Sequence, residues 1–193
     1  MKNLLIVSFL LLGRSLFADS ILVYSGKEYA EVHRAGGDVA PLDPGRNAFF
    51  ADYVADLGRQ GPFEKAMDLV NPPTWGKTVS PVTHGTIQFH PSFARGFVCH
   101  LALENLLPDH AYILTLNGNP AKAGNNLLST PVPGNEQERY YDFLTITTDA
   151  HGRYGANLGI YLKPGEYDVR CYVKDTADFK IVLYRDFFEF IVN

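Results

Sequence analysis

FVCHLAL, residues 97–103, and YDVRCYV, residues 167–173, are the two stretches with the clearest strand pattern. In each stretch a large apolar side chain or a cysteine stands at every second position. This period of two is typical of a β-strand with one buried face. Cys99 and Cys171 both lie on the apolar face, so we expect both to point into a core.

The same alternation recurs from Val79 to the end of the chain, with turn residues between the runs. The expected strands span residues 84–90, 96–104, 111–117, 139–148, 154–162, 166–174 and 179–191. Half-buried strands in this number need a second apolar face to pack against, which predicts a mainly β domain of two sheets, a sandwich over 79–193. Residues 117–138 are rich in Asn, Pro and Gly and should form the largest loop.

Residues 19–78 have a different pattern. Ser20–Tyr24 is a short strand candidate. Two short helices are expected after it, one over 49–57 and one beginning at Pro62. Their apolar faces would comprise Phe49, Phe50, Tyr53, Val54 and Leu57 in the first, and Phe63, Ala66, Met67 and Val70 in the second. A segment this short buries too little surface to fold alone, so we expect it to dock on the sandwich.

Residues 1–18, MKNLLIVSFLLLGRSLFA, have the layout of a secretory signal peptide. Lys2 provides the positive start, an apolar run follows, and Ala18 is a small residue at the expected cleavage site. The alternative is a membrane anchor, but the apolar run is about half of the ~20 residues that span a bilayer. We therefore expect a secreted, periplasmic or cell-surface protein without a transmembrane segment after cleavage.

Composition narrows the function classes. The 193 residues include 17 Lys+Arg against 21 Asp+Glu, a net charge of −4, and 13% are aromatic. Disordered chains have fewer aromatic residues, and nucleic-acid-binding proteins have basic clusters. The chain is thus expected to be globular and not to bind nucleic acid.

Cys99 and Cys171 are the two cysteines of the chain. In an exported protein disulfides persist, so the simplest expectation is that the two pair with each other and join the facing sheets. The alternative is a pair of separate buried thiols, since cysteine is common in protein cores.

Two motifs resemble known families. Leu106, Pro108 and Tyr112 have the spacing L-x-P-x-x-x-Y, which is similar to the tyrosine corner of fibronectin type III domains. The resemblance implies that the Tyr112 ring covers one end of the core and that its hydroxyl bonds to upstream backbone.

The second motif, TDAHGRY at 148–154 followed by LKPGEYDV at 162–169, resembles repeats of prealbumin-like and collagen-adhesin B-type domains of bacterial surface proteins. It predicts a tight hairpin turn at Asp149–Gly152 and another turn at Pro164–Gly165. Together the resemblances imply a secreted, immunoglobulin-like β-sandwich preceded by a short helical segment, without assigning a specific family.

Histidines are the clearest metal candidates, because His84, His90, His100 and His110 lie close together in sequence. In a hairpin of 84–90 with 96–104, His90 and His100 would be diagonal neighbours at roughly 7–8 Å. Their spacing matches no common zinc or copper motif. We expect surface histidines and no cofactor, with His90 and His100 as the weak candidates for a metal.

Catalytic motifs are missing from the sequence: it has no G-x-S-x-G, H-E-x-x-H, P-loop or dinucleotide glycine pattern. Exposed aromatic residues are the remaining signal. Trp75 lies between Pro73 and Gly76, and of the adjacent Tyr140 and Tyr141 one must face away from the core. Trp75, Tyr140 and Tyr141 are therefore the binding candidates, although Trp75 could instead fill the junction with the N-terminal segment.

The sequence thus predicts an exported, non-catalytic β-sandwich protein. It would bind a surface glycan or another exported protein, or act as a structural module. The alternative is a periplasmic metal-binding protein or a hydrolase.

Overall fold

The computed structural model describes residues 62–93, 96–122, 127–128, 130–132, 134–162 and 164–193, together with the backbone of 21–24. These residues form strands and turns. The strands are β1 (Ile21–Tyr24), β2 (Lys65–Leu69), β3 (His84–Phe89), β4 (Ser92–Phe93), β5 (Phe97–Glu104), β6 (Ala111–Gly118), β7 (Thr130–Val132), β8 (Asn135–Thr147), β9 (Tyr154–Tyr161), β10 (Gly165–Asp175) and β11 (Ile181–Val192).

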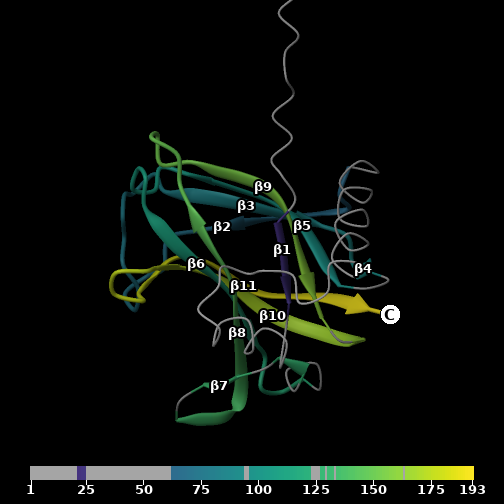
Figure 1. Ribbon diagram of the computed structural model, residues 1–193. Coiled ribbons are helices and arrows are strands. Elements are labelled where there is room, and N and C mark those ends of the chain that lie inside the picture. The colour runs from purple at the N-terminus through teal and green to yellow at the C-terminus, as the bar shows by residue number, and fades with distance from the viewer. Residues whose placement is uncertain are drawn as a thin grey trace, which may run out of the picture.

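The strands make two sheets that lie one over the other (Figure 1). Sheet A has the order β1-β9-β5-β3-β2, and sheet B has the order β4-β11-β10-β6-β8-β7. Most neighbours are antiparallel, whereas β1 runs parallel to β9 and β4 runs parallel to β11. Within the described residues, no helix is long and apolar enough to cross a membrane.

The mainly β class and the two sheets predicted from the alternating runs are confirmed, and each expected strand corresponds to one of β3, β5, β6, β8, β9, β10 and β11. The expected hairpin of β3 with β5 is also present, with Gln88 opposite His100. The loop expected over 117–138 is shorter than predicted, because β7 and the first part of β8 pair with each other inside it.

The helix expected from Pro62 is wrong. Residues 65–69 form β2, which pairs antiparallel with β3, so that Met67 lies opposite Ile87. The segment is only five residues long and contains both apolar and charged residues, so it fits a helix turn and a strand equally well, and here the partner strand decides. Sheet A therefore includes residues that precede Val79, where the predicted sandwich begins. The helix expected over 49–57 and the signal peptide lie outside the described residues.

One core lies between the sheets. Its phenylalanines come from both layers: Phe89 and Phe97 of sheet A contact Phe188 and Phe190 of sheet B, at ring-centroid distances of 4.4 to 6.1 Å. Burial of each such side chain contributes roughly 1.5 to 3 kcal/mol.

Cys99 and Cys171 are buried in this core, as their strand faces predicted, from β5 of sheet A and β10 of sheet B. Both are free thiols in the structure, so the predicted disulfide is not formed there. Burial raises the pKa of the Cys99 thiol, and the nearby Cys171 raises it further. Both thiols are therefore protonated at neutral pH, and neither is suited to act as a nucleophile.

The turn at Asp149–Gly152 is tight, as predicted, but it does not make a hairpin. It leads from β8 of sheet B to β9 of sheet A, so it connects the two layers. Asp149 N–H donates to the Arg153 carbonyl at 2.8 Å, and the Asp149 carboxylate accepts from two further backbone N–H groups. Pro164–Gly165 likewise lies where the chain passes from β9 of sheet A to β10 of sheet B, and Gly165 is the first residue of β10. Sequence patterns show where a chain turns, whereas sheet membership depends on which strands pair.

The tyrosine-corner prediction is confirmed in its geometry. Tyr112 is fully buried at one end of the core, and its hydroxyl accepts a hydrogen bond of 3.1 Å from the Leu107 backbone N–H, five residues upstream. Next to it, the buried Thr148 hydroxyl donates to the Leu107 carbonyl at 2.6 Å. These bonds fix the connection between β5 and β6.

Candidate functional site

The outer face of sheet B carries a hollow of about 380 Å³, here called the Trp75 hollow. Its walls are Trp75, Arg170, Tyr172, Ile181, Tyr184 and Asp186. Tyr172 of β10 and Tyr184 of β11 lie directly opposite each other. The Trp75 ring stands edge-on to both, with centroid distances of 5.0 Å to Tyr184 and 6.3 Å to Tyr172.

Trp75 belongs to the loop between β2 and β3, and backbone bonds hold this loop against β11. Val70 and Tyr184 exchange two hydrogen bonds of 2.9 Å, and Lys77 N–H donates to the Ile181 carbonyl at 2.8 Å. The Lys77 ammonium also bonds to the Asp175 carboxylate at 2.6 Å. Trp75 is therefore held in place on both sides while its side chain remains 53% exposed.

Polar groups lie at one side of the hollow. The Arg170 guanidinium donates to Asp186 at 3.1 Å and lies 3.6 Å from Glu138. It also lies over the Phe187 ring, 4.0 Å from the centroid. Arg170 is thus fixed in one orientation, and a ligand in the hollow would meet a charged donor beside a carboxylate.

Tyr140 and Tyr141, the two tyrosines among the predicted binding residues, point to opposite faces of sheet B. Tyr141 is 1% exposed and points into the core, so its ring is not presented to a partner in this structure. Tyr140 is half-buried on the outer face of sheet B, where the Lys174 ammonium lies 5.1 Å from its ring centroid. One tyrosine faces in and one faces out, as the strand pattern required.

Trp75 and Tyr140 lie on the same outer face. Tyr184, Tyr172, Thr115 and Asp142 occupy successive register positions across β11, β10, β6 and β8. Lys174 continues the row, because it bonds to Asp142 at 2.8 Å and covers Tyr140. The structure therefore places two of the predicted binding residues at the two ends of one strip.

Sequence reasoning missed Tyr172 and Tyr184. A signal was present for Tyr172, which alternates with Val173 and Cys171 and so belongs to the outer face of its strand. For Tyr184 the alternation is interrupted, because a bulge between β10 and β11 shifts the register near Asp186.

The histidine candidates have separate partners. His90 lies 3.4 Å from Glu64, and His100 Nδ1 lies 3.0 Å from Asn157 Oδ1. His84 is near Glu104 at 3.6 Å, and His110 bonds to Asp175 at 2.8 Å. Among the described residues, no three His, Cys, Asp or Glu side chains converge as a metal site would require.

Comparisons with protein-family models, curated proteins and solved structures find no match to this chain.

Proposed function

We propose that this chain is an exported, non-catalytic protein with an immunoglobulin-like sandwich, and that it binds a glycan at the Trp75 hollow. The observation that carries the proposal is an exposed indole held edge-on to two tyrosines beside a fixed arginine–carboxylate pair. Trp75, Tyr172 and Tyr184 are the contact residues, and Tyr140 extends the surface.

Strand order supports the immunoglobulin-like assignment. In that fold one sheet has the order A-B-E-D, and the other contains C-F-G. Here β3, β5 and β9 follow one another in sheet A, and β6, β10 and β11 do so in sheet B. On this correspondence Cys99 and Cys171 occupy the B and F strands, which is where immunoglobulin domains place their inter-sheet disulfide.

The chemistry of the hollow suits a sugar. The apolar face of a pyranose ring packs on an aromatic side chain, and its hydroxyls need donors and acceptors at the edge. Arg170 supplies donors, Asp186 supplies acceptors, and the hollow of about 380 Å³ has room for a small saccharide. The fixed positions of Trp75 and Arg170 reduce the entropy lost on binding.

A glycan array with the mature protein, followed by calorimetric titration of the best ligand, tests the proposal. We expect Trp75→Ala to weaken binding about thirtyfold, the effect of a hot-spot aromatic residue. The matched control is Phe179→Ala, because Phe179 is 67% exposed but lies outside the hollow. This control should bind as the unmodified protein does.

A Tyr140→Ala variant then measures how far the ligand extends. Loss of affinity for an oligosaccharide but not for its terminal monosaccharide would assign Tyr140 to the same site. Absence of any glycan signal, or equal losses in Trp75→Ala and Phe179→Ala, would contradict the proposal.

A further inference from the structure

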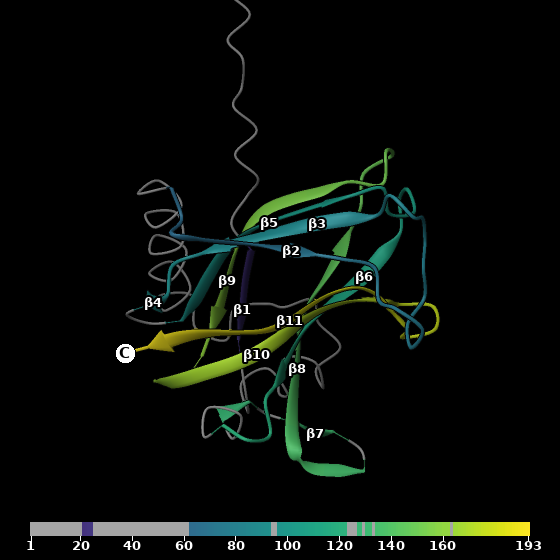
Figure 2. The ribbon, with the colours of Figure 1, turned by 180° about the vertical axis from the view of Figure 1, so that it is seen from behind.

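The two sheets meet along one side at a seam between β2 and β11. Beyond β2, Val70 pairs with Tyr184 and closes the seam at one end. From that point the two strands diverge toward the C-terminus of β11 (Figure 2). Within the described part of the chain, no further strand pairing joins β2 to β11. As far as the described residues show, the seam is therefore closed at one end and open at the other.

β2 presents backbone groups to the open part of the seam. Along a strand, the N–H and C=O groups of every second residue point to the same edge. Val70 bonds across the seam to Tyr184, so the backbone groups of Asp68 and Ala66 face the seam as well. Both residues are exposed.

β11 presents a second edge. Ile191 N–H donates to the Pro91 carbonyl beside β4, so Glu189 and Phe187 face the same edge by the same period of two. β4 pairs only with Ile191 and Val192 and does not extend to these residues. On its other edge β11 pairs with β10, but among the residues that the structure describes Glu189 and Phe187 have no strand partner on this edge.

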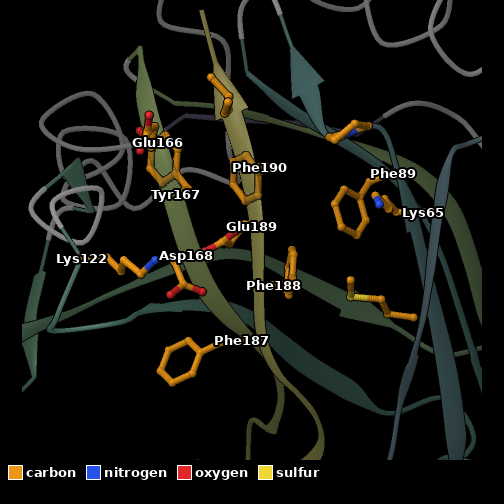
Figure 3. Close-up of a pocket in the computed structure, with 13 residues that line it drawn as sticks. Lys65, Phe89, Lys122, Glu166, Tyr167, Asp168, Phe187, Phe188, Glu189 and Phe190 are labelled. Carbon is orange, nitrogen blue, oxygen red and sulfur yellow. Dashed lines mark hydrogen bonds and ion pairs between the residues drawn. The ribbon is translucent and has the colours of Figure 1, made fainter.

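The open seam has an apolar floor within a hollow of about 900 Å³. Figure 3 shows Phe89 and Lys65 on one side of the gap and Phe188 and Phe190 on the other. The Phe89 and Phe188 rings meet at 5.1 Å, and the half-buried Met67 also lines the hollow. The phenylalanines Phe89, Phe188 and Phe190 belong to the core and are at most 3% exposed. The apolar side chains that an added strand would contact are therefore those of Met67, Phe187 and Ile191, which also line the hollow and are partly exposed.

Charge at the edges is mainly acidic. Glu64 and Asp68 are exposed beside and on β2, and Glu189 is exposed on β11. Lys65 and Lys122 also line the hollow, and Lys122 pairs with Glu189 at 3.1 Å, so these two charges cancel. The exposed Glu64, Asp68 and Glu166 then leave an acidic excess over Lys65. A basic peptide is therefore favoured over an acidic one.

We propose that the open seam binds an extended peptide of alternating apolar residues with basic ends, which adds as a strand to the free edge of β11. Backbone hydrogen bonds to Phe187 and Glu189 give affinity, and contacts with the partly exposed side chains of Phe187 and Met67 select the apolar side chains. This site is independent of the Trp75 hollow.

The probe is a synthetic peptide of about six residues, a typical strand length, with alternating Val and Thr between terminal lysines. Its control has the same sequence with N-methyl groups on the residues whose N–H groups would face β11. Fluorescence anisotropy with the mature protein should show binding of the probe and at least tenfold weaker binding of the control. Equal binding of both peptides, or binding of neither, would overturn the proposal.

The protein variants are Glu189→Pro, which removes a backbone donor at the seam, and Glu189→Ala, which keeps it. We expect the proline variant to lose about tenfold in affinity and the alanine variant to retain most of it. Equal losses would show that the side chain, and not the backbone edge, makes the contact.

Hydrogen exchange of the unmodified protein gives a readout even if the proline variant fails to fold. The amides of Phe187 and Glu189 should exchange fast in the free protein and slowly with the probe. Slow exchange in the free protein would mean that another part of the chain or a second copy already covers the edge, and would exclude the proposed peptide.

Discussion

The end of the sandwich at Tyr112 and Thr148, here called the corner end, differs from the outer face of sheet B in how it uses polar and aromatic residues. At the corner end, the Tyr112 hydroxyl, the Thr148 hydroxyl and the Asp175 carboxylate are buried and hydrogen-bonded to neighbouring elements. On the outer face, Trp75 remains half-exposed and packs against tyrosines instead of entering the core.

The difference separates stability from recognition. Buried polar groups with complete hydrogen bonding fix one arrangement of the chain, whereas exposed aromatic rings contribute little to folding and are suited to binding. Changes in the core and at the corner end should therefore reduce stability, and changes on the outer face should reduce binding alone.

Truncation should have the largest effect on stability. A protein that begins at Val79 lacks β2, including the buried Leu69, and exposes the edge of β3. We expect it to lose about 5 kcal/mol of stability or to aggregate. Urea denaturation should compare it with proteins that begin at Pro62 and at Asp19. A lower midpoint for the Pro62 version than for the Asp19 version would support docking of residues 19–61, and equal midpoints for all three would contradict both expectations.

The disulfide should have the second-largest effect on stability. If Cys99 and Cys171 pair in the exported protein, the bond closes a long loop and contributes about 4 kcal/mol. Mass spectrometry after alkylation, with and without reduction, identifies the bond, and denaturation with and without reductant measures its effect. Two alkylated thiols in the native exported protein would show that the free state seen in the structure is the natural one.

At the corner end, Gly152→Ala should cost about 3 kcal/mol. Gly152 has φ of 70°, and an added Cβ would overlap the Leu106 carbonyl oxygen. Gly134→Ala is the control, since Gly134 has φ of 80° but open space around it. It should cost about 1 kcal/mol, the backbone effect alone. Equal losses in thermal unfolding would show that the contact with Leu106 is unimportant.

Asp175 should make stability depend on pH. Burial raises the pKa of its carboxyl, but hydrogen bonds from Lys77, the Ala177 N–H and His110 lower it by more, to about 2. Because this pKa lies below the ordinary value of 3.8, the interaction stabilises the fold above about pH 4 and is lost as the pH falls through 2. Asp175→Asn should flatten the dependence in this window, measured by urea denaturation at each pH.

The exposed Asp178, which shares Lys77 at 3.3 Å, provides the matched control. Asp178→Asn should leave the pH dependence nearly unchanged. If both variants flatten the curve alike, the buried position of Asp175 has no special role.

The smallest change in stability is expected on the outer face. Trp75→Ala should alter the free energy of unfolding by less than about 0.5 kcal/mol, as is usual for surface positions. Tyr112→Phe should cost about 1 kcal/mol through loss of the hydroxyl bond. Glycan affinity, in contrast, should fall more in Trp75→Ala than in Tyr112→Phe. A Trp75→Ala protein that unfolds more easily than Tyr112→Phe would show that Trp75 is a packing residue, the alternative left open by the sequence.

Much of the local structure follows from the sequence alone. Alternation placed the strands around Cys99 and Cys171 and required one of Tyr140 and Tyr141 to face outward. These features depend on residues close in the chain, and the side-chain period of a strand fixes them before any long-range contact forms. The bond from the Tyr112 hydroxyl to upstream backbone was implied by the resemblance of the L-x-P-x-x-x-Y segment to a tyrosine corner.

Which strands are neighbours depends on long-range contacts. Residues 65–69 became a strand because β3 was present to pair with them, and the turn at Gly152 became a connection between layers because β8 and β9 found partners in different sheets. For the same reason Trp75, Tyr172 and Tyr184 meet although they are far apart in sequence. Pairing between distant strands is set by the total burial and hydrogen bonding of the whole chain, and a local pattern carries no information about that sum.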